Sequence, residues 1–331
     1  MKNKKIIVAL FFLPLLSCKR NLKTEGPNLE DLYGEFKILQ PFQVSSGTVD
    51  FSTGESVHFT CKFNKPSDWT LTITGPNKAK KILTGKSNTL DLNNAVWNGT
   101  TTHFPTFSTG LCDAELFVKA DSSYHKLKVQ VNGKKKPGGQ VVADFETGIQ
   151  SGWKVFAQTG ANMSFLIRDT GIIPEGGKYY DMGGAVNWDW LIGMIDFPAS
   201  AYGTGGFKLG GNPDDLYFNV VINRPANLTN GIVLFQFRED ENSDGLFNTN
   251  NEDMYSIELN NLKSGWQIYS IKYSELVCLV NGSPSTPKGN GRFDADKLFQ
   301  ISCLFLANPS SGYSKVGMDY IVFTQGKPLE L

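Results

Sequence analysis

Alternation of apolar and polar residues is the dominant pattern of the chain from about residue 42 onwards. The clearest case is the run 126–131, where three aliphatic residues alternate with two lysines and a glutamine. A period of two places the apolar side chains on one face of a β-strand and the polar ones on the other. Turn-forming pairs such as Asn98-Gly99 and Asn132-Gly133 separate such runs. The pattern predicts an all-β protein.

Short runs between residues 41 and 132 predict a first, small sandwich. The predicted strands lie at residues 56–63, 69–73, 116–118 and 126–131. Several short strands in about ninety residues are typical of an immunoglobulin-like domain. Cys61, Trp69 and Cys112 stand in the same order as the cysteine, tryptophan and cysteine of true immunoglobulin domains.

A charged segment rich in Pro and Gly, residues 133–140, separates this unit from a second one at residues 141–331. The second unit has predicted strands at 141–146, 216–222, 232–237, 255–259, 266–271, 301–306 and 318–323, and a short helix near 294–298. Strands at this spacing are typical of a jelly-roll sandwich. Trp153 and Trp266 are expected in its core. The predicted fold is thus all-β, with an N-terminal immunoglobulin-like sandwich followed by a C-terminal jelly-roll β-sandwich.

The start of the chain follows a different pattern. Lysines precede an apolar run at residues 6–16, which is too short to span a bilayer. The run ends in Leu-Leu-Ser-Cys18, which resembles the bacterial lipobox, whose cysteine is lipidated. We expect a signal peptide at residues 1–17, a lipid on Cys18 and a tether at residues 18–40. Basic residues after Cys18 leave open whether the protein faces the cell surface or the periplasm from the outer membrane.

Export implies an oxidising compartment, in which cysteines form disulfides. The expected pairs are Cys61 with Cys112 and Cys278 with Cys303. The alternative for each pair is two small buried hydrophobic side chains.

Charge and histidine content narrow the functional classes. The 32 Lys and Arg balance 32 Asp and Glu, so the excess positive charge of a nucleic-acid binder is missing. The three histidines, His58, His103 and His125, all lie in the first unit. A Ser/His/Asp triad or a histidine-rich zinc site therefore cannot be built within the second unit. A glycosidase needs only two carboxylates, so it stays an alternative.

Aromatic residues in the second unit are candidates for binding sugar rings, because the C–H face of a sugar packs on an aromatic ring. Trp188 and Trp190 would share one face of a strand, and Tyr179 and Tyr180 stand just upstream. The alternative is that these rings fill the core. Sugar hydroxyls also need planar polar partners, for which the candidates are Asp189, Gln236 and Arg238.

An acidic segment is a candidate calcium loop. Asp240, Asn242 and Asp244 offer oxygen atoms at positions 1, 3 and 5, and Gly245 follows at position 6. Glu252 stands one position beyond the last ligand of an EF-hand, so the segment is not an EF-hand. A calcium site and a solvated acidic hairpin are both open.

Two ends of the second unit resemble a known family. The Asp-Phe-Glu at residues 144–146, with Gly148 and Trp153, is similar to the start of jelly-roll carbohydrate-binding modules. Residues 319–324 and 327–329 resemble the end of glycan-binding lipoproteins from Bacteroidota glycan-utilisation systems. Those proteins are anchored by lipid, carry immunoglobulin-like spacers and end in a glycan-binding domain, which is the order predicted here.

The resemblance implies a non-catalytic protein that captures a polysaccharide or oligosaccharide at the outer membrane for a glycan transporter complex. It also implies a structural calcium held by Glu146 and Asp319. The alternatives are an adhesion or structural lipoprotein of the cell envelope and, less favoured, a glycoside hydrolase or lyase.

Overall fold

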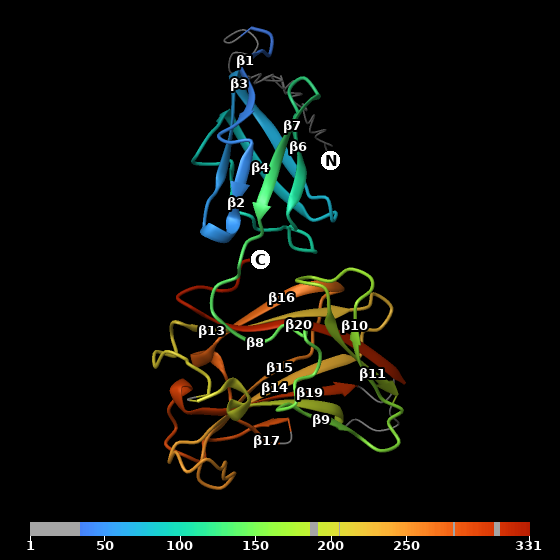
Figure 1. Ribbon diagram of the computed structural model, residues 1–331, viewed down its shortest axis with the longest axis vertical. Helices are drawn as coiled ribbons and strands as arrows, with labels where there is room; N and C mark the ends of the chain where they lie inside the picture. Colours follow the sequence, from blue (N-terminus) through green and yellow to red (C-terminus); the bar gives the residue numbers. More distant parts are fainter. Residues whose placement is uncertain (1–33, 186–190, 205, 281, 308–311) are drawn as a thin grey trace, which may run out of the picture.

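The computed structural model describes residues 34–185, 191–204, 206–280, 282–307 and 312–331. Two β-rich units follow one another along the long axis of the molecule, the first coloured blue to green and the second green to red (Figure 1). Among these residues, strands make up nearly all of the regular structure, with four short 3-10 turns between them, so the predicted all-β class is confirmed. Within these residues, no helix is long and apolar enough to cross a membrane.

The N-terminal unit is one curled sheet around a core. Its strands are β1 (Ile38–Val44), β2 (Thr48–Asp50), β3 (Val57–Thr74), β4 (Lys80–Leu90), β5 (Val96–Trp97), β6 (Gly110–Val118) and β7 (Ser123–Gly133), and η1 spans Phe51–Thr53. The sheet order is β1-β3-β6-β7-β2, while β4 and β5 also pair with β3. The two runs predicted at 56–63 and 69–73 are halves of β3, whose register with β4 shifts between Lys62 and Ser67. The immunoglobulin-like assignment of this unit stays a prediction.

The cysteines of the N-terminal unit are free, so the predicted Cys61–Cys112 disulfide is wrong. Cys61 Sγ points towards β1 and donates to the carbonyl oxygen of Gln40 at 3.3 Å. Both thiols are buried. Removal from water disfavours the thiolate, which raises the pKa of both to about 11. The alternative of two buried hydrophobic side chains holds for this pair.

The C-terminal unit is a sandwich of two antiparallel sheets (Figure 1). The proximal sheet, on the side of the N-terminal unit, has the order β10-β11-β20-β13-β16 with β8 beside β20. Its strands are β8 (Gln140–Ala143), β10 (Ser164–Arg168), β11 (Tyr179–Ala185), β13 (Leu216–Arg224), β16 (Gly265–Lys272) and β20 (Tyr313–Gln325). The distal sheet has the order β15-β14-β19-β12-β9. Its strands are β9 (Lys154–Ala157), β12 (Leu191–Pro198), β14 (Gly231–Glu239), β15 (Met254–Leu259) and β19 (Leu298–Ala307).

Shorter elements connect these strands. They are the hairpin β17 (Leu279–Val280) and β18 (Ser283–Pro284), and the 3-10 turns η2 (Ala199–Tyr202), η3 (Tyr273–Glu275) and η4 (Ala295–Lys297). The turn η4 lies where the short helix is predicted. All seven strands predicted for this unit are present, whereas β9 to β12 were not predicted from the sequence.

Aromatic rings fill the space between the two sheets. Phe218 of the proximal sheet meets Phe235 of the distal sheet with ring centroids 4.8 Å apart. Trp153 packs edge-on against Phe197, so its predicted core position is confirmed. Cys303 also points into this core, where its sulfur lies 3.7 Å from Met318 Sδ.

The predicted disulfide between Cys278 and Cys303 is also wrong, because both thiols are free. Cys303 is fully buried between the sheets, whereas Cys278 lines a pocket on the outer side of the distal sheet. Cys278 follows Val277, which pairs with Ser256 of the edge strand β15, whereas Cys303 lies on β19, two strands further into the sheet.

The two units contact each other directly. Phe104 of the N-terminal unit packs against an apolar cluster on the outer face of the proximal sheet that includes Val221 and Leu331. The amide of Thr101 donates to the carbonyl oxygen of Leu331 at 2.6 Å. At the other end of the chain, β1 begins at Ile38, within the segment predicted as tether.

Candidate functional site

The predicted ligand-binding residues do not form one site. Trp188, Asp189 and Trp190 lie outside the described residues. Tyr180 is 1% exposed, and its ring stacks between those of Phe145 and Phe165. Because its side chain faces the core, the prediction that Tyr180 binds ligand is wrong.

The other three predicted ligand-binding residues, Tyr179, Gln236 and Arg238, lie on opposite faces of the sandwich. Tyr179 is on the outer face of the proximal sheet, where Trp266 meets it edge to face. Gln236 and Arg238 alternate with the core residues Phe235 and Phe237 on β14, so they point outward from the distal sheet. No single sugar ring can contact both sets.

The outer face of the distal sheet carries a polar row that crosses five strands. Its members are paired in register in the order Ser256, Gln236, Ser302, Asp196 and Lys154. Neighbouring strands lie about 4.8 Å apart, so the row is about 19 Å long. Alternation along each strand produces the row: on β12, β14, β15 and β19 the residues before and after each member pack in the core, and on β9 the residue before Lys154, Trp153, does so.

An apolar row runs beside the polar row. It consists of Leu234, Leu304, Met194 and Phe156, again paired across adjacent strands. Phe156 is 46% exposed at the edge strand β9. In the polar row Gln236 is partly exposed and Lys154 is exposed, whereas Ser256, Ser302 and Asp196 are buried. The two rows place hydrogen-bonding groups next to an apolar surface. We call these two rows together the distal groove.

Several buried polar atoms of this region have no hydrogen-bond partner within the described residues. They are Asp196 Oδ1, Arg238 Nε, Ser256 Oγ and Glu252 Oε1. An unsatisfied buried polar atom costs about 1–3 kcal/mol. Such atoms are rare in native proteins unless a water, ion or ligand completes them. Their concentration on one face marks it as a candidate binding site.

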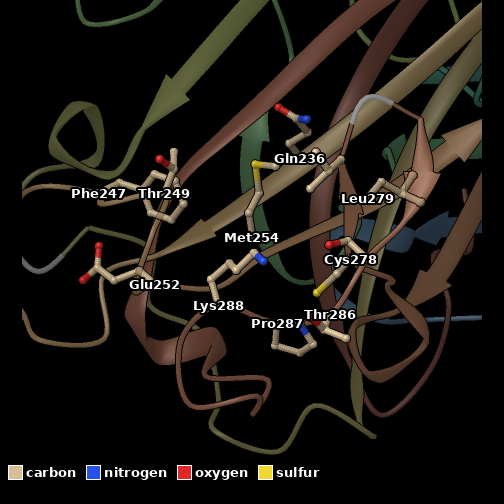
Figure 2. Close-up of a pocket in the computed structure, with 12 residues that line it drawn as sticks. Gln236, Phe247, Thr249, Glu252, Met254, Cys278, Leu279, Thr286, Pro287 and Lys288 are labelled. Atoms are coloured by element: carbon tan, nitrogen blue, oxygen red, sulfur yellow. The ribbon is translucent and has the colours of Figure 1, made fainter.

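A pocket of about 360 Å³ lies at the β15 end of the distal groove (Figure 2). Gln236 and Met254 line it from the distal sheet, and the Lys288 side chain points towards Met254 (Figure 2). Glu252 closes another side. Its Oε2 accepts from the amide of Asn248 at 2.6 Å, while its Oε1 is one of the unpartnered atoms.

Arg238 is held beside this pocket by an aromatic ring. Its guanidinium carbon lies 5.6 Å from the ring centroid of Phe247, which also lines the pocket. A cation–π contact of this kind fixes the guanidinium without using its N–H donors. The pocket thus combines one acid, nearby bases, an amide and a thioether around a space large enough for a small polar ligand.

In the predicted calcium loop, the side-chain oxygen atoms accept hydrogen bonds from backbone amides of the same loop. Asp240 accepts from the amides of Asp244 and Gly245 at 3.1 and 2.9 Å. Asn242 Oδ1 accepts from the amide of Asp244, and Asp244 Oδ1 accepts from that of Leu246. Glu252 lies in the pocket of Figure 2 rather than against this turn.

A different carboxylate cluster forms next to the loop. Oxygen atoms of Glu239, Glu241 and Asp294 lie within 4.8 Å of one another. Burial raises the pKa of Glu239 to about 8, and the nearby charges of Asp294 and Asp253 add to this. Oxygen ligands at this spacing suit a hard cation such as calcium. The sequence shows these glutamates flanking Asp240, but it does not show that Asp294 comes beside them.

The second predicted calcium pair is brought together near the junction of the units. Asp319 is fully buried and accepts from the amides of Tyr320 and Glu175 at 2.7 and 3.3 Å. Its pKa is raised well above the ordinary range by burial and by the charges of Glu175 and Glu146. The Glu146 carboxylate accepts from the amides of Gly177 and Lys178, and Glu175 pairs with Lys134 at 2.8 Å. A calcium ion held by Glu146 and Asp319 stays a prediction.

No known protein family and no curated protein matches the sequence. Among solved structures, the chain is similar to a family 11 carbohydrate-binding module from Clostridium thermocellum in complex with a β-1,3-1,4-mixed-linked tetrasaccharide. The identity is 15%, the match covers 59% of this chain and 99% of that module, and the TM-score is 0.39.

It is also similar to SGBP-B from a complex xyloglucan utilization locus in Bacteroides uniformis. There the identity is 15%, the coverage 86% of this chain and 73% of the other, and the TM-score 0.37. A third neighbour comes from a study of promiscuous carbohydrate-binding modules of the β-sandwich superfamily, with 11% identity, 88% and 99% coverage and a TM-score of 0.39. Because these values are low, the function has to be argued from the residues of the site.

Proposed function

We propose that this chain is a non-catalytic glycan-binding protein that holds a polysaccharide or oligosaccharide in the distal groove. The observation that carries the proposal is the polar row beside the apolar row, because the row includes the buried unpartnered atoms of Asp196 and Ser256 and Arg238 Nε lies next to it. Sugar hydroxyls would complete those atoms, and sugar C–H faces would cover Phe156 and Met194. Each unpartnered atom raises the free energy of the empty groove. A sugar hydroxyl that bonds to the atom removes this cost, and the same free energy then favours binding.

The groove favours binding over hydrolysis. A glycosidase places two carboxyl groups about 5 to 10 Å apart across the scissile bond. Within the described part of the polar row, Asp196 is the one carboxylate, and Lys154 lies opposite it in the strand pairing. The residue types of the row therefore supply hydrogen bonds rather than an acid and base pair.

The cellular role follows from the start of the chain. We propose that a lipid on Cys18 anchors the protein to the outer membrane and that the bound glycan is passed to a transporter complex. The lipobox resemblance supports the anchor. Cys18→Ser should abolish labelling by a fatty-acid analogue and release the protein from the envelope fraction, and protease treatment of whole cells would decide which side of the membrane it faces.

Affinity electrophoresis tests glycan binding. The wild type should be retarded by at least one soluble neutral polysaccharide from a panel of mixed-linkage β-glucan, xyloglucan, xylan and galactomannan. Gln236→Ala and Phe156→Ala should each reduce the retardation, because one removes a row amide and the other an exposed apolar surface. Tyr124→Ala is the matched control, since Tyr124 is a 59% exposed aromatic residue on β7 of the other unit.

The outcomes separate the alternatives. A wild type that no polysaccharide retards contradicts glycan binding and leaves the adhesion or structural role. Retardation that Gln236→Ala and Phe156→Ala leave intact contradicts the groove alone. Release of reducing sugar from the panel would favour a glycoside hydrolase.

A further inference from the structure

A second cleft lies where the N-terminal unit meets the outer face of the proximal sheet. Its volume is about 850 Å³. Residues 101–104 of the N-terminal unit form one wall, and β11, β13, β16 and the loop at 171–172 form the rest. Strands β13, β16 and β20 lie on the side of the second unit that is turned towards the first (Figure 1). We call this space the junction cleft.

Two aromatic side chains meet in the junction cleft. Trp266 and Tyr179 touch edge to face, with ring centroids 5.2 Å apart and an interplanar angle of 85°. They come from strands at opposite sides of β20 and β13. Gly317 of β20 allows them to meet, because a Cβ there would lie 3.0 Å from Trp266 Cη2 and 3.2 Å from Tyr179 Cε2.

The indole of Trp266 is fixed in this position. Its Nε1 donates to the carbonyl oxygen of Ile172 at 2.8 Å, so the polar edge of the ring is satisfied. The prediction that Trp266 lies in the core of the sandwich is therefore wrong, because its side chain faces the junction cleft. An aromatic ring fixed before binding loses little conformational entropy when a ligand packs on it.

Polar groups surround these rings. Asn223 lies opposite Trp266 in the pairing of β13 with β16. In the described part of the chain, the Asn223 amide, the Tyr179 hydroxyl and the His103 ring have no hydrogen-bond partner. His103 belongs to the N-terminal unit, so both units present free polar groups to one space.

Charged side chains do not line the junction cleft. Among its described lining residues there is no Asp, Glu, Lys or Arg, although 19% of the chain is charged. The nearby Asp181 is already paired with Arg168 and Lys315, at 2.9 and 3.0 Å. A cleft with aromatic rings, an amide, a hydroxyl and no charge suits a neutral polyhydroxylated ligand better than an anionic or cationic one.

We infer that the junction cleft is a second glycan-binding site, which takes a neutral sugar segment and is built jointly by the two units. It goes beyond the distal groove, because it lies on the opposite face of the sandwich and has a different composition. The N-terminal unit then contributes directly to recognition, and a bound sugar bridges the two units and restricts their relative movement.

The alternative is that Trp266 has only a structural role and stabilises the interface between the units, since it also packs against the apolar cluster that Phe104 contacts and that includes Leu331. Variants that leave this cluster intact decide between the two. Asn223→Ala and His103→Ala remove free polar groups, and Tyr179→Phe removes only a hydroxyl. All three should keep the wild-type melting temperature, whereas Trp266→Ala removes both packing and stacking surface.

The experiment is isothermal titration and affinity electrophoresis of the full mature chain with mixed-linkage β-glucan, xyloglucan and galactomannan, and with polygalacturonate as an anionic contrast. The junction variants are made alone and on top of Gln236→Ala with Phe156→Ala. We expect two classes of site in the wild type, and about tenfold weaker binding when Trp266→Ala is added to the groove variants. Asn223→Ala and His103→Ala should each weaken the same class, and Tyr124→Ala should change neither.

The possible results distinguish the junction cleft from the distal groove and test the neutral ligand class. If the three variants Trp266→Ala, Asn223→Ala and His103→Ala bind like their parents, the junction cleft is not a glycan site, whatever the distal groove does. If only the junction variants lose binding, the cleft stands and the distal groove is wrong. If no neutral glycan binds to the wild type, both proposals fail, and if polygalacturonate binds through Trp266, the neutral ligand class is wrong. Should Trp266→Ala unfold, Asn223→Ala and His103→Ala carry the decision.

Discussion

The raised pKa of Glu239 predicts how the stability of the C-terminal unit depends on pH. Its carboxyl group is fully buried, accepts from the Tyr273 hydroxyl at 2.8 Å, and accepts from the amide of Asp294 at 3.1 Å. Burial, with the negative charges of Asp294 and Asp253, raises its pKa from 4.5 to about 8. The two hydrogen bonds oppose this rise but do not cancel it.

The direction of the pKa shift determines whether stability rises or falls with pH. A carboxyl group whose pKa is higher in the folded state binds its proton more tightly when folded, so folding is favoured most below about pH 4.5 and the gain is lost as the pH rises to about 8. Each pH unit in this window costs about 1.4 kcal/mol. Between pH 5 and 7 the loss is about 3 kcal/mol, which corresponds to a fall of about 6–12 °C in the melting temperature of a unit of this size.

The assay is thermal unfolding of the full chain at pH 5, 6, 7 and 8 with a chelator present, because a divalent cation at Glu239 would mask the effect. Glu239→Gln is the matched variant: its amide oxygen can still accept from the amide of Asp294, its NH2 group can donate to the Tyr273 hydroxyl oxygen, and it cannot ionise. We expect the wild type to lose stability with pH more steeply than Glu239→Gln, with the difference closing at pH 5. Parallel pH profiles of the two proteins would refute the assignment.

Three further predictions concern cations, thiols and packing. Calcium should raise the melting temperature of the C-terminal unit, and Asp319→Asn should reduce the increase if Glu146, Glu175 and Asp319 hold the ion; an unchanged melting temperature in calcium would speak against both predicted sites. A thiol reagent should modify Cys278 first in the folded mature chain and four cysteines besides Cys18 after denaturation, and a denatured count of two would restore a disulfide. Phe218→Ala should cost about 3–5 kcal/mol in a denaturant titration, because it empties the centre of the aromatic core; a cost below 1 kcal/mol would mean that the core collapses around the gap.

Strands could be predicted from the sequence where one face of the strand is buried and the other is exposed to solvent, or where all residues of the strand are apolar. The runs of β13, β14, β19 and β20 are of this kind, because each crosses the centre of a sheet. The strands β9 to β12 were missed for local reasons. In β11, Gly183 and Gly184 lower the strand propensity, yet a Cβ at either position would overlap the hydroxyl of Tyr313 or the sulfur of Met163. Tertiary packing demands the glycines, and the sequence does not reveal that packing.

The candidate site was harder to predict than the strands, because the alternation of residues along a strand does not say which sheet the strand joins. Tyr179 and Gln236 were both expected to bind ligand, and the structure places them on opposite outer faces of the sandwich, where they point away from each other. Trp266 was expected in the core because it follows Gly265 at the start of an alternating strand. Trp266 instead lies on the outer face of the proximal sheet, and the N-terminal unit and Leu331 cover this face. The boundary between the two units therefore creates a second buried environment.

The opposite placement of the distal groove and the junction cleft has a consequence for how a long glycan would bind. One short oligosaccharide cannot occupy both, because the full thickness of the sandwich separates the outer faces of its two sheets. Two stacked sheets lie about 10 Å apart, and the side chains on each outer face add to this separation. A long polysaccharide can engage both sites through distant segments or can join two molecules, and either arrangement raises the effective concentration of sugar at the second site. Apparent affinity should therefore rise with glycan length beyond the length of either site, and this dependence should vanish when Trp266→Ala or Gln236→Ala removes one of the two. A length dependence that persists in both variants would mean that a single site extends beyond the residues assigned to it.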